Sequence, residues 1–152
     1  GIASGLPLGA CMASKEIMNQ WTPGSHGGTF GGNPLTCAAG IATLDVLEPI
    51  LPGIETLGND AIEYCKDKLK DHPNIGDIRG KGLMIGIEVV KDQDKTPDPD
   101  RVKEILSTCL NEKLILVSCG IHQNVIRLMP ALTIDKDTLF KGLDILINTI
   151  RS

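Results

Sequence analysis

Aromatic side chains are scarce in this sequence, because Phe, Trp and Tyr together make up 3% of its 152 residues. Hydrophobic residues still reach 41%, so aliphatic side chains must fill the core of a chain whose length is usual for one domain. No apolar run approaches the ~20 residues of a membrane-spanning helix, and we expect no membrane partner. A basic excess is also missing. The formal net charge of −4, with both signs interspersed, argues against a nucleic-acid-binding surface.

Cysteine pairs with metal-binding spacing are absent as well. The five cysteines are odd in number and form no C-x-x-C pair, and the three histidines stand apart from one another. We therefore expect neither a metal site nor a disulfide framework, and interpret the cysteines as reduced, mostly buried thiols of a cytoplasmic protein. The sequence opens in turn-forming residues, without an initiator Met or the basic region of a signal peptide. We interpret this start as the interior of a longer protein.

A glycine-rich stretch ahead of a predicted helix is the most informative part of the sequence: Ser25-His26-Gly27-Gly28-Thr29-Phe30-Gly31-Gly32-Asn33-Pro34. Glycines let a ligand approach the backbone closely. Asn33 is a favourable N-cap and Pro34 fits the first helical position, and the free N–H groups of a helix N-terminus attract anions. The pattern is typical of a loop that holds a phosphate. From the residues alone, a glycine-rich surface loop without a ligand is an equally good interpretation.

Arg127 is a second candidate, because it lies between Ile126 and Leu128 in a predicted apolar strand. A guanidinium in such surroundings needs a partner, and its planar fork matches a carboxylate. From the residues alone, a salt bridge to a structural Asp or Glu is the better interpretation. We interpret Arg79, which precedes a Gly-Lys-Gly turn, and Glu88, in a predicted strand, as structural.

Hydrophobic periodicity and turn residues divide the chain at a hinge near residues 48–53. Before the hinge we predict an apolar strand over 6–12, a brief helix after Ser14, and a helix over 33–47 whose many small residues indicate burial. Residues 1–50 lack a sheet of their own and would expose apolar surface unless another chain covered it. After the hinge we predict a small, largely antiparallel sheet covered by helices, with helices over 54–70, 99–112 and 135–150 and strands over 75–79, 83–90, 114–117 and 124–129.

Three stretches of the sequence together resemble the class III aminotransferases that depend on pyridoxal phosphate. In that family a glycine-rich run like Gly1–Ala10 follows the cofactor lysine, and a Gly-Gly-Thr-aromatic-x-Gly-Asn-Pro motif like Gly27–Pro34 comes some twenty residues later. A strand with a carboxylate-binding arginine, like Val125–Leu128, lies further on. The resemblance extends from Gly1 to about Arg151 and covers the C-terminal part of a family member. It implies an α/β fold: the end of the large PLP-transferase (fold type I) domain with an interdomain helix over 1–50, then a small α+β domain with a mainly antiparallel sheet over 51–152.

The resemblance also implies roles for particular residues. Thr29 would bind the phosphate of pyridoxal 5'-phosphate, and the N–H groups of Gly28 and Gly27 would lie near the same phosphate. Because this threonine reaches the cofactor of the neighbouring subunit in the family, a homodimer with a shared active site is implied. Arg127 would bind the substrate carboxylate. The cofactor lysine is expected immediately before Gly1, so no catalytic residue is expected within the sequence; Lys15 is interpreted as a solvated helix residue.

The activity implied is transfer of an amino group from an amino acid or ω-amino acid to a 2-oxo acid. Ser118-Cys119-Gly120 and the segment 124–127 look closer to the 4-aminobutyrate branch of the family than to the acetylornithine branch. A racemase or epimerase of the same family shares these motifs and stays an alternative. A non-catalytic α/β domain that binds a phosphate or a partner, and a degenerate aminotransferase kept as an assembly subunit, also remain open.

Overall fold

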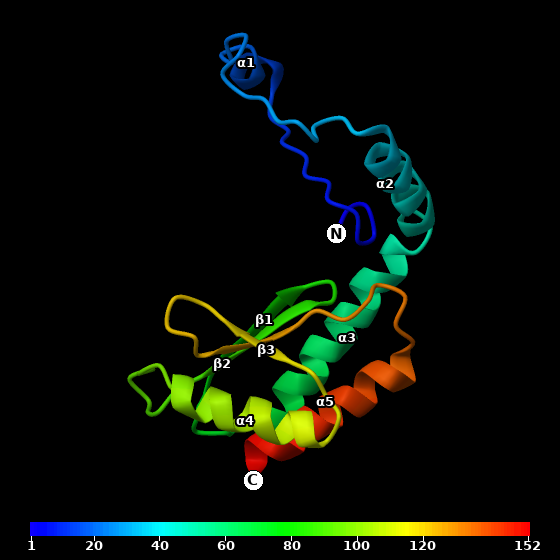
Figure 1. Cartoon of the computed structure of the whole chain (residues 1–152). Helices are drawn as coiled ribbons and strands as arrows, with labels where there is room; N and C mark the ends of the chain where they lie inside the picture. The colour runs from blue at the N-terminus through cyan, green and yellow to red at the C-terminus, as the bar shows by residue number, and fades with distance from the viewer. The chain divides into compact units, whose positions relative to one another are not determined.

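The computed structural model describes all of residues 1–152 and divides into two compact units, Gly1–Ile50 and Leu51–Ser152. The first unit holds two helices, and the second holds three helices and a four-stranded sheet (Figure 1). In chain order the elements are α1 Lys15–Met18, α2 Pro34–Leu47, α3 Leu51–Leu69, β1 Ile75–Lys81, β2 Met84–Val89, α4 Pro99–Asn111, β3 Val117–Cys119, β4 Val125–Leu128 and α5 Lys136–Arg151.

Helix α2 of the first unit begins where the sequence predicts. Oδ1 of Asn33 accepts hydrogen bonds from the backbone N–H groups of Leu35 at 3.0 Å and Thr36 at 3.3 Å, and Pro34 occupies the first turn. The helix packs closely on the N-terminal segment of the same unit. A Cβ on Gly40 would lie 2.7 Å from a side-chain carbon of Leu8, so only glycine fits there without a shift of the leucine.

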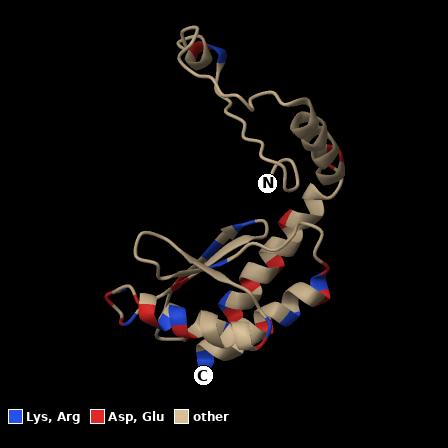
Figure 2. Ribbon diagram, in the orientation of Figure 1, with Lys and Arg blue, Asp and Glu red and all other residues tan.

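Two predictions for the first unit are wrong. Residues 6–12 form no strand, because no other strand in this unit offers backbone hydrogen bonds to pair with. Helix α2 is mostly exposed rather than buried, with only Thr36 and Gly40 buried, since little besides the N-terminal segment packs on it. Its exposed large apolar residues are Leu35, Ile41, Leu44 and Val46. Charge is sparse in this unit (Figure 2), whose charged residues are Lys15, Glu16, Asp45 and Glu48.

The sheet of the second unit has the strand order β1-β2-β4-β3, and all neighbouring pairs are antiparallel. Helices α3 and α4 pack against the strands, and α5 packs against both helices, so the three helices lie together beside the sheet (Figure 1). Strand β2 shows the alternation that the sequence predicts: Ile85, Ile87 and Val89 are buried, whereas Met84 is exposed. The predicted antiparallel sheet with one covered face is confirmed. Along β1 the register shifts by one residue at Gly76, between Ile75 and Asp77.

The predicted strand over 114–117 is displaced. Strand β3 covers Val117–Cys119 instead, and Ile115 is 80% exposed. The cause lies at the end of α4, where Lys113 has a φ of +66° and the Leu114 N–H returns to the Cys109 carbonyl oxygen at 2.8 Å. Because this turn at the C-terminal end of α4 includes Leu114, pairing with β4 begins only at Val117.

The three helices of the second unit otherwise follow the prediction. Helix α3 begins at Leu51, earlier than expected, because Pro52 and Gly53 form its first turn rather than breaking it; a proline there loses no helical hydrogen bond. Helix α5 is capped as predicted, with Oδ1 of Asp135 accepting from the Thr138 N–H at 2.8 Å. No single helix is long and apolar enough to cross a membrane; only α2 and α3 counted together would pass, on length and composition alone.

Candidate active site

The glycine-rich loop presents backbone donors that the chain itself does not use. Gly27, Gly28 and Thr29 are exposed, and their N–H groups donate to no backbone carbonyl. The Gly31 N–H closes a turn on the Gly28 carbonyl oxygen at 3.1 Å, and Gly32 has a φ of +69°, a conformation that favours glycine. Thr29 therefore lies on the turn with its hydroxyl and N–H exposed.

The N-terminus of α2 is not the source of these donors, which corrects the sequence interpretation. Pro34 has no N–H, and Asn33 already accepts from the N–H groups of Leu35 and Thr36. The free donors lie upstream, in the three N–H groups and the Thr29 hydroxyl. A cluster of N–H and O–H donors fits the oxygens of a phosphate, which accept several hydrogen bonds at once.

Arg127 lies in β4, directly opposite Gly86 of β2 and Val117 of β3. The residue is half-buried, and its Nε is fully buried without a hydrogen-bond partner. It takes part in none of the ion pairs of the chain, so the structural salt bridge that the residues alone favoured is not formed. A buried N–H without an acceptor costs about 1–3 kcal/mol, so a ligand that supplies an acceptor would relieve this cost.

Arg127 also contributes to the wall of a pocket of about 390 Å³, beside β3, β4 and α5. It is the only charged residue of that wall. The others are Leu114, Ile115, Leu116, Val117, Leu128, Met129, Pro130, Ile134, Thr138, Leu139, Gly142 and Leu143. An apolar wall lowers the local dielectric and strengthens the attraction between a guanidinium and a carboxylate.

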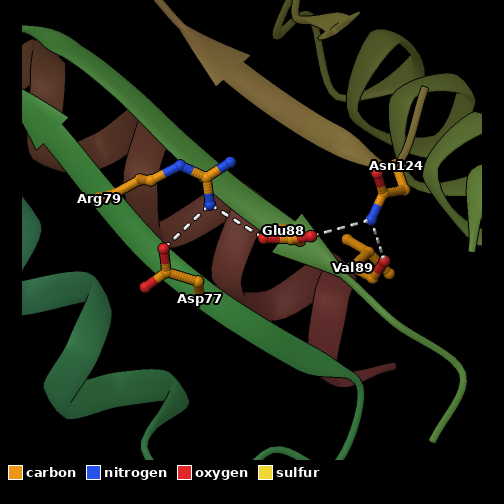
Figure 3. A network of polar contacts seen from close by, with 5 residues as sticks. All are labelled: Asp77, Arg79, Glu88, Val89 and Asn124. Atoms are coloured by element: carbon orange, nitrogen blue, oxygen red, sulfur yellow. Dashed lines mark hydrogen bonds and ion pairs between the residues drawn. The ribbon is translucent and has the colours of Figure 1, made fainter. Parts of the chain in front are cut away.

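A polar network joins β1, β2 and the residue directly before β4 (Figure 3). Nη1 of Arg79 donates to Oδ2 of Asp77 and to Oε2 of Glu88, both at 2.9 Å. Glu88 also accepts from Nδ2 of Asn124 at 3.4 Å, and the same amide donates to the Val89 carbonyl oxygen at 3.0 Å. The hydrogen bonds that Arg79 donates to Glu88 and then to Asp77 raise the pKa of Arg79.

Comparison with known protein families identifies the family to which this chain belongs. The model of the aminotransferase class-III family matches residues 1–150. The chain belongs to this family. The resemblance seen in the three sequence motifs is thereby confirmed.

Individual relatives of this class III aminotransferase chain agree with the assignment. It is 41% identical to the 4-aminobutyrate aminotransferase of Mycobacterium leprae over 96% of the chain and 33% of the relative. The acetylornithine aminotransferase of Aquifex aeolicus is 37% identical over 96% of the chain and 35% of the relative. The crystal structure of adenosylmethionine-8-amino-7-oxononanoate aminotransferase from Methanocaldococcus jannaschii matches with a TM-score of 0.79 and 33% identity, over 99% of the chain and 37% of that structure.

The chain spans about a third of the length of these relatives. All three are named aminotransferases, which does not favour the racemase, epimerase or non-catalytic alternatives. The solved aminotransferase structures that it matches support the predicted fold class.

The site residues predicted for this class III aminotransferase chain form two groups. Gly27, Gly28 and Thr29 share one loop of the first unit, and Arg127 lies in the second unit. Sequence reasoning missed Asn124, which is a polar residue only 3% exposed. Its position directly before an apolar strand was the available signal, because a buried amide needs partners.

Proposed function

We propose that this chain forms part of a pyridoxal-phosphate-dependent aminotransferase, which moves an amino group from an amino acid or an ω-amino acid such as 4-aminobutyrate to a 2-oxo acid. The observation that carries the proposal is the buried, unpartnered Nε of Arg127 beside an apolar pocket, in a chain of the class III family. Amino donor and 2-oxo acid both carry a carboxylate. One arginine can therefore bind either substrate in turn.

In this proposal Thr29, Gly28 and Gly27 bind the cofactor phosphate through one hydroxyl and up to three N–H groups, which are free in the structure. When bound, the cofactor supplies the electron-withdrawing ring on which amino transfer depends. The phosphate contacts fix the cofactor without taking part in proton transfer. In this proposal the lysine that moves the proton lies immediately before Gly1, as the family resemblance implies.

Arg127 orients the substrate in the same proposal. A bidentate pair of hydrogen bonds to a carboxylate fixes both its position and its plane, so the substrate amine or carbonyl is presented in one orientation. Val117 and Met129 lie beside Arg127 in the pocket wall, so this pair would form against an apolar surface. A lysine at position 127 would keep the positive charge but lose the planar donor group that binds a carboxylate through two hydrogen bonds.

We also propose a homodimer with a shared active site, working in the cytoplasm. Helix α2 exposes Leu35, Ile41, Leu44 and Val46, an apolar surface that a partner subunit would cover. The domain assignment is part of this proposal: residues 1–50 would complete the large cofactor-binding domain, and residues 51–152 would form the small domain. The cysteine pattern of the sequence, odd in number and without a C-x-x-C pair, supports a reducing compartment.

The test of the reaction uses the protein that contains these residues, loaded with pyridoxal phosphate and supplied with 4-aminobutyrate and 2-oxoglutarate. We expect glutamate as product. Arg127→Met should lower kcat/KM by roughly 100-fold, because two charge-assisted hydrogen bonds are lost, and Arg127→Lys should recover part of it. Lys103→Met, whose lysine pairs with Asp100 on the exposed side of α4, is the charge-matched control. Inversion of an amino acid without glutamate formation would replace transamination by racemisation.

The test of the shared site mixes two inactive variants, Thr29→Ala and Arg127→Met. If Thr29 of one subunit serves the active site of its partner and Arg127 serves its own, a mixed dimer contains one site with both defects and one intact site. We expect about a quarter of the wild-type activity after random exchange of subunits. No recovery, with exchange demonstrated by mass spectrometry, would place both residues in one subunit's own site.

A further inference from the structure

The register of the sheet places Glu88 diagonally between two arginines. Arg79 of β1 and Arg127 of β4 both lie directly opposite Gly86 of β2, one on each side. Glu88 is two residues from Gly86, so all of these residues project from the same face of the sheet. Diagonal neighbours on antiparallel strands lie ~7–8 Å apart, which long side chains span. By register, Glu88 is thus within reach of either arginine.

The structure shows which arginine Glu88 binds. Its Oε2 accepts from Arg79 at 2.9 Å, and its Oε1 accepts from Asn124 at 3.4 Å (Figure 3). Arg79 is bound from its other side by Asp77, again at 2.9 Å. Both carboxylate oxygens of Glu88 are therefore occupied by groups other than Arg127. Arg127 makes no ion pair, and its Nε has no partner.

An internal carboxylate within reach of Arg127 would compete with a ligand carboxylate for the same guanidinium. The internal group is tethered, so it has the advantage of a high local concentration. Gly86, between the two arginines, has no side chain of its own, but the side chain of Val125, which pairs with Glu88, lies over it: a Cβ on Gly86 would be 3.2 Å from Val125. Glu88 would therefore have to pass Val125 to reach Arg127, and it would also have to give up the pair of hydrogen bonds that it already makes.

We propose that Arg79 is a positioning residue: by binding Glu88 it keeps this carboxylate away from Arg127 and leaves Arg127 open to the carboxylate of the ligand. The inference rests on the proposed function, because it takes Arg127 as the carboxylate-binding residue. It also assigns Asn124 an accessory part, since its amide, fixed by the Val89 carbonyl oxygen, holds the second oxygen of Glu88. Removing Arg79 would free Glu88 to pair with Arg127.

The experiment follows Arg127 directly by NMR in the full chain, using its ¹⁵Nε–H signal, which the Arg127→Lys variant identifies. The probe is glutarate, a simple dicarboxylate. We expect glutarate to shift the signal in the wild type, and Arg79→Met to weaken its affinity by about fivefold, as expected for a competing, partly exposed ion pair. The double variant Arg79→Met/Glu88→Gln should restore the wild-type affinity, since the competing charge is gone. Lys103→Met removes one positive charge elsewhere and should leave the affinity unchanged.

The pattern across the variants separates the possible outcomes. Weaker binding in Arg79→Met with recovery in the double variant supports the proposal, provided that both variants have the thermal stability of the wild type, because the loss of affinity then depends on the charge of Glu88. Equal affinity in Arg79→Met and the wild type overturns the positioning role alone. Equal weakening in the single and double variants also overturns it, in favour of structural damage. Absence of any glutarate effect on the wild-type signal overturns both the positioning role and the proposed carboxylate role of Arg127.

Discussion

Replacing Gly58 by alanine tests how closely α3 packs against the turn between β1 and β2. Gly58 is buried in the middle of α3 and faces Gly82 in the turn between β1 and β2. A Cβ added to Gly58 would lie 2.1 Å from the Gly82 carbonyl oxygen and 2.4 Å from its carbonyl carbon. Gly82 cannot easily move aside, because its φ of +54° is a turn conformation that favours glycine.

Two effects of opposite sign compete in Gly58→Ala. Alanine improves helix propensity by about 1 kcal/mol. The steric overlap is with backbone atoms, so helix and turn must separate, and overpacking of this kind costs about 1–3 kcal/mol and occasionally more. The separation also uncovers neighbouring core contacts of Ile54 and Ile62. Because the overlap is with backbone atoms, we take the upper end of this range, about 3 kcal/mol, and after the propensity gain we expect a net loss of about 2 kcal/mol in the free energy of unfolding.

Gly53→Ala is the matched control on the same helix. A Cβ on Gly53 meets no atom within 4 Å, so only the propensity gain of up to about 1 kcal/mol remains. Urea unfolding followed by far-UV circular dichroism should show a midpoint lowered by about 1 M for Gly58→Ala and unchanged or raised for Gly53→Ala. A Gly58→Ala variant as stable as the wild type would refute the close approach of α3 to the turn. Equal losses in both variants would attribute the effect to glycine replacement in general.

Three further predictions concern single residues. Hydrogen bonds from the Thr138 N–H and then from its hydroxyl lower the pKa of Asp135. This cap therefore stabilises the fold above about pH 4, and the stabilisation is lost as the pH falls through the lowered pKa. The melting temperatures of Asp135→Ala and the wild type should differ at neutral pH and converge in acid. Burial raises the pKa of the Cys65 thiol to about 11. Maleimide at about pH 8 should therefore label exposed Cys11 and leave Cys65 unlabelled until urea is added, and mass spectrometry would identify the labelled residues. Asn33→Ala should cost α2 about 1 kcal/mol and speed hydrogen exchange in its first turn; unchanged exchange would contradict the cap.

Local patterns predicted most of the second unit because its elements obey local rules. Ile85, Ile87 and Val89 alternate with residues of the opposite face, which is sufficient to define a strand with one covered side. The cap of α5 at Asp135 depends only on residues within one turn. Features decided by neighbours close in sequence were therefore open to prediction.

Long-range pairing explains what the sequence did not reveal. The position of β3 depends on where Val117 meets Arg127, and nothing near Val117 in the sequence specifies that register. The exposure of α2 depends on which surfaces are present to cover it, and its composition alone indicated a buried helix.

The candidate site divides in the same way. The donors around Thr29 were predictable from the glycines that surround it, since those residues fix the local backbone. For Arg127 the residues alone favoured a salt bridge, because they do not show which carboxylate lies within reach. The alignment of three strands brings Glu88 within reach of both arginines, and that it binds Arg79 instead of Arg127 could only be seen in the folded chain.

The extra residue at Gly76 makes one position of β1 tolerant of a change in length. Ile75 pairs with Val89, which is buried on the covered face, whereas Asp77 pairs with Glu88 on the opposite face. In a regular strand, residues two apart project to the same side, so Gly76 is the residue that reconciles these two pairings. Loss of Gly76 alone would leave every other side chain of β1 facing as it does now. Loss of any single residue from Asp77 to Lys81 would instead turn the side chains on one side of the deletion to the opposite face of the sheet. Insertions and deletions among related sequences should therefore occur at Gly76 and be absent from the segment that carries Arg79.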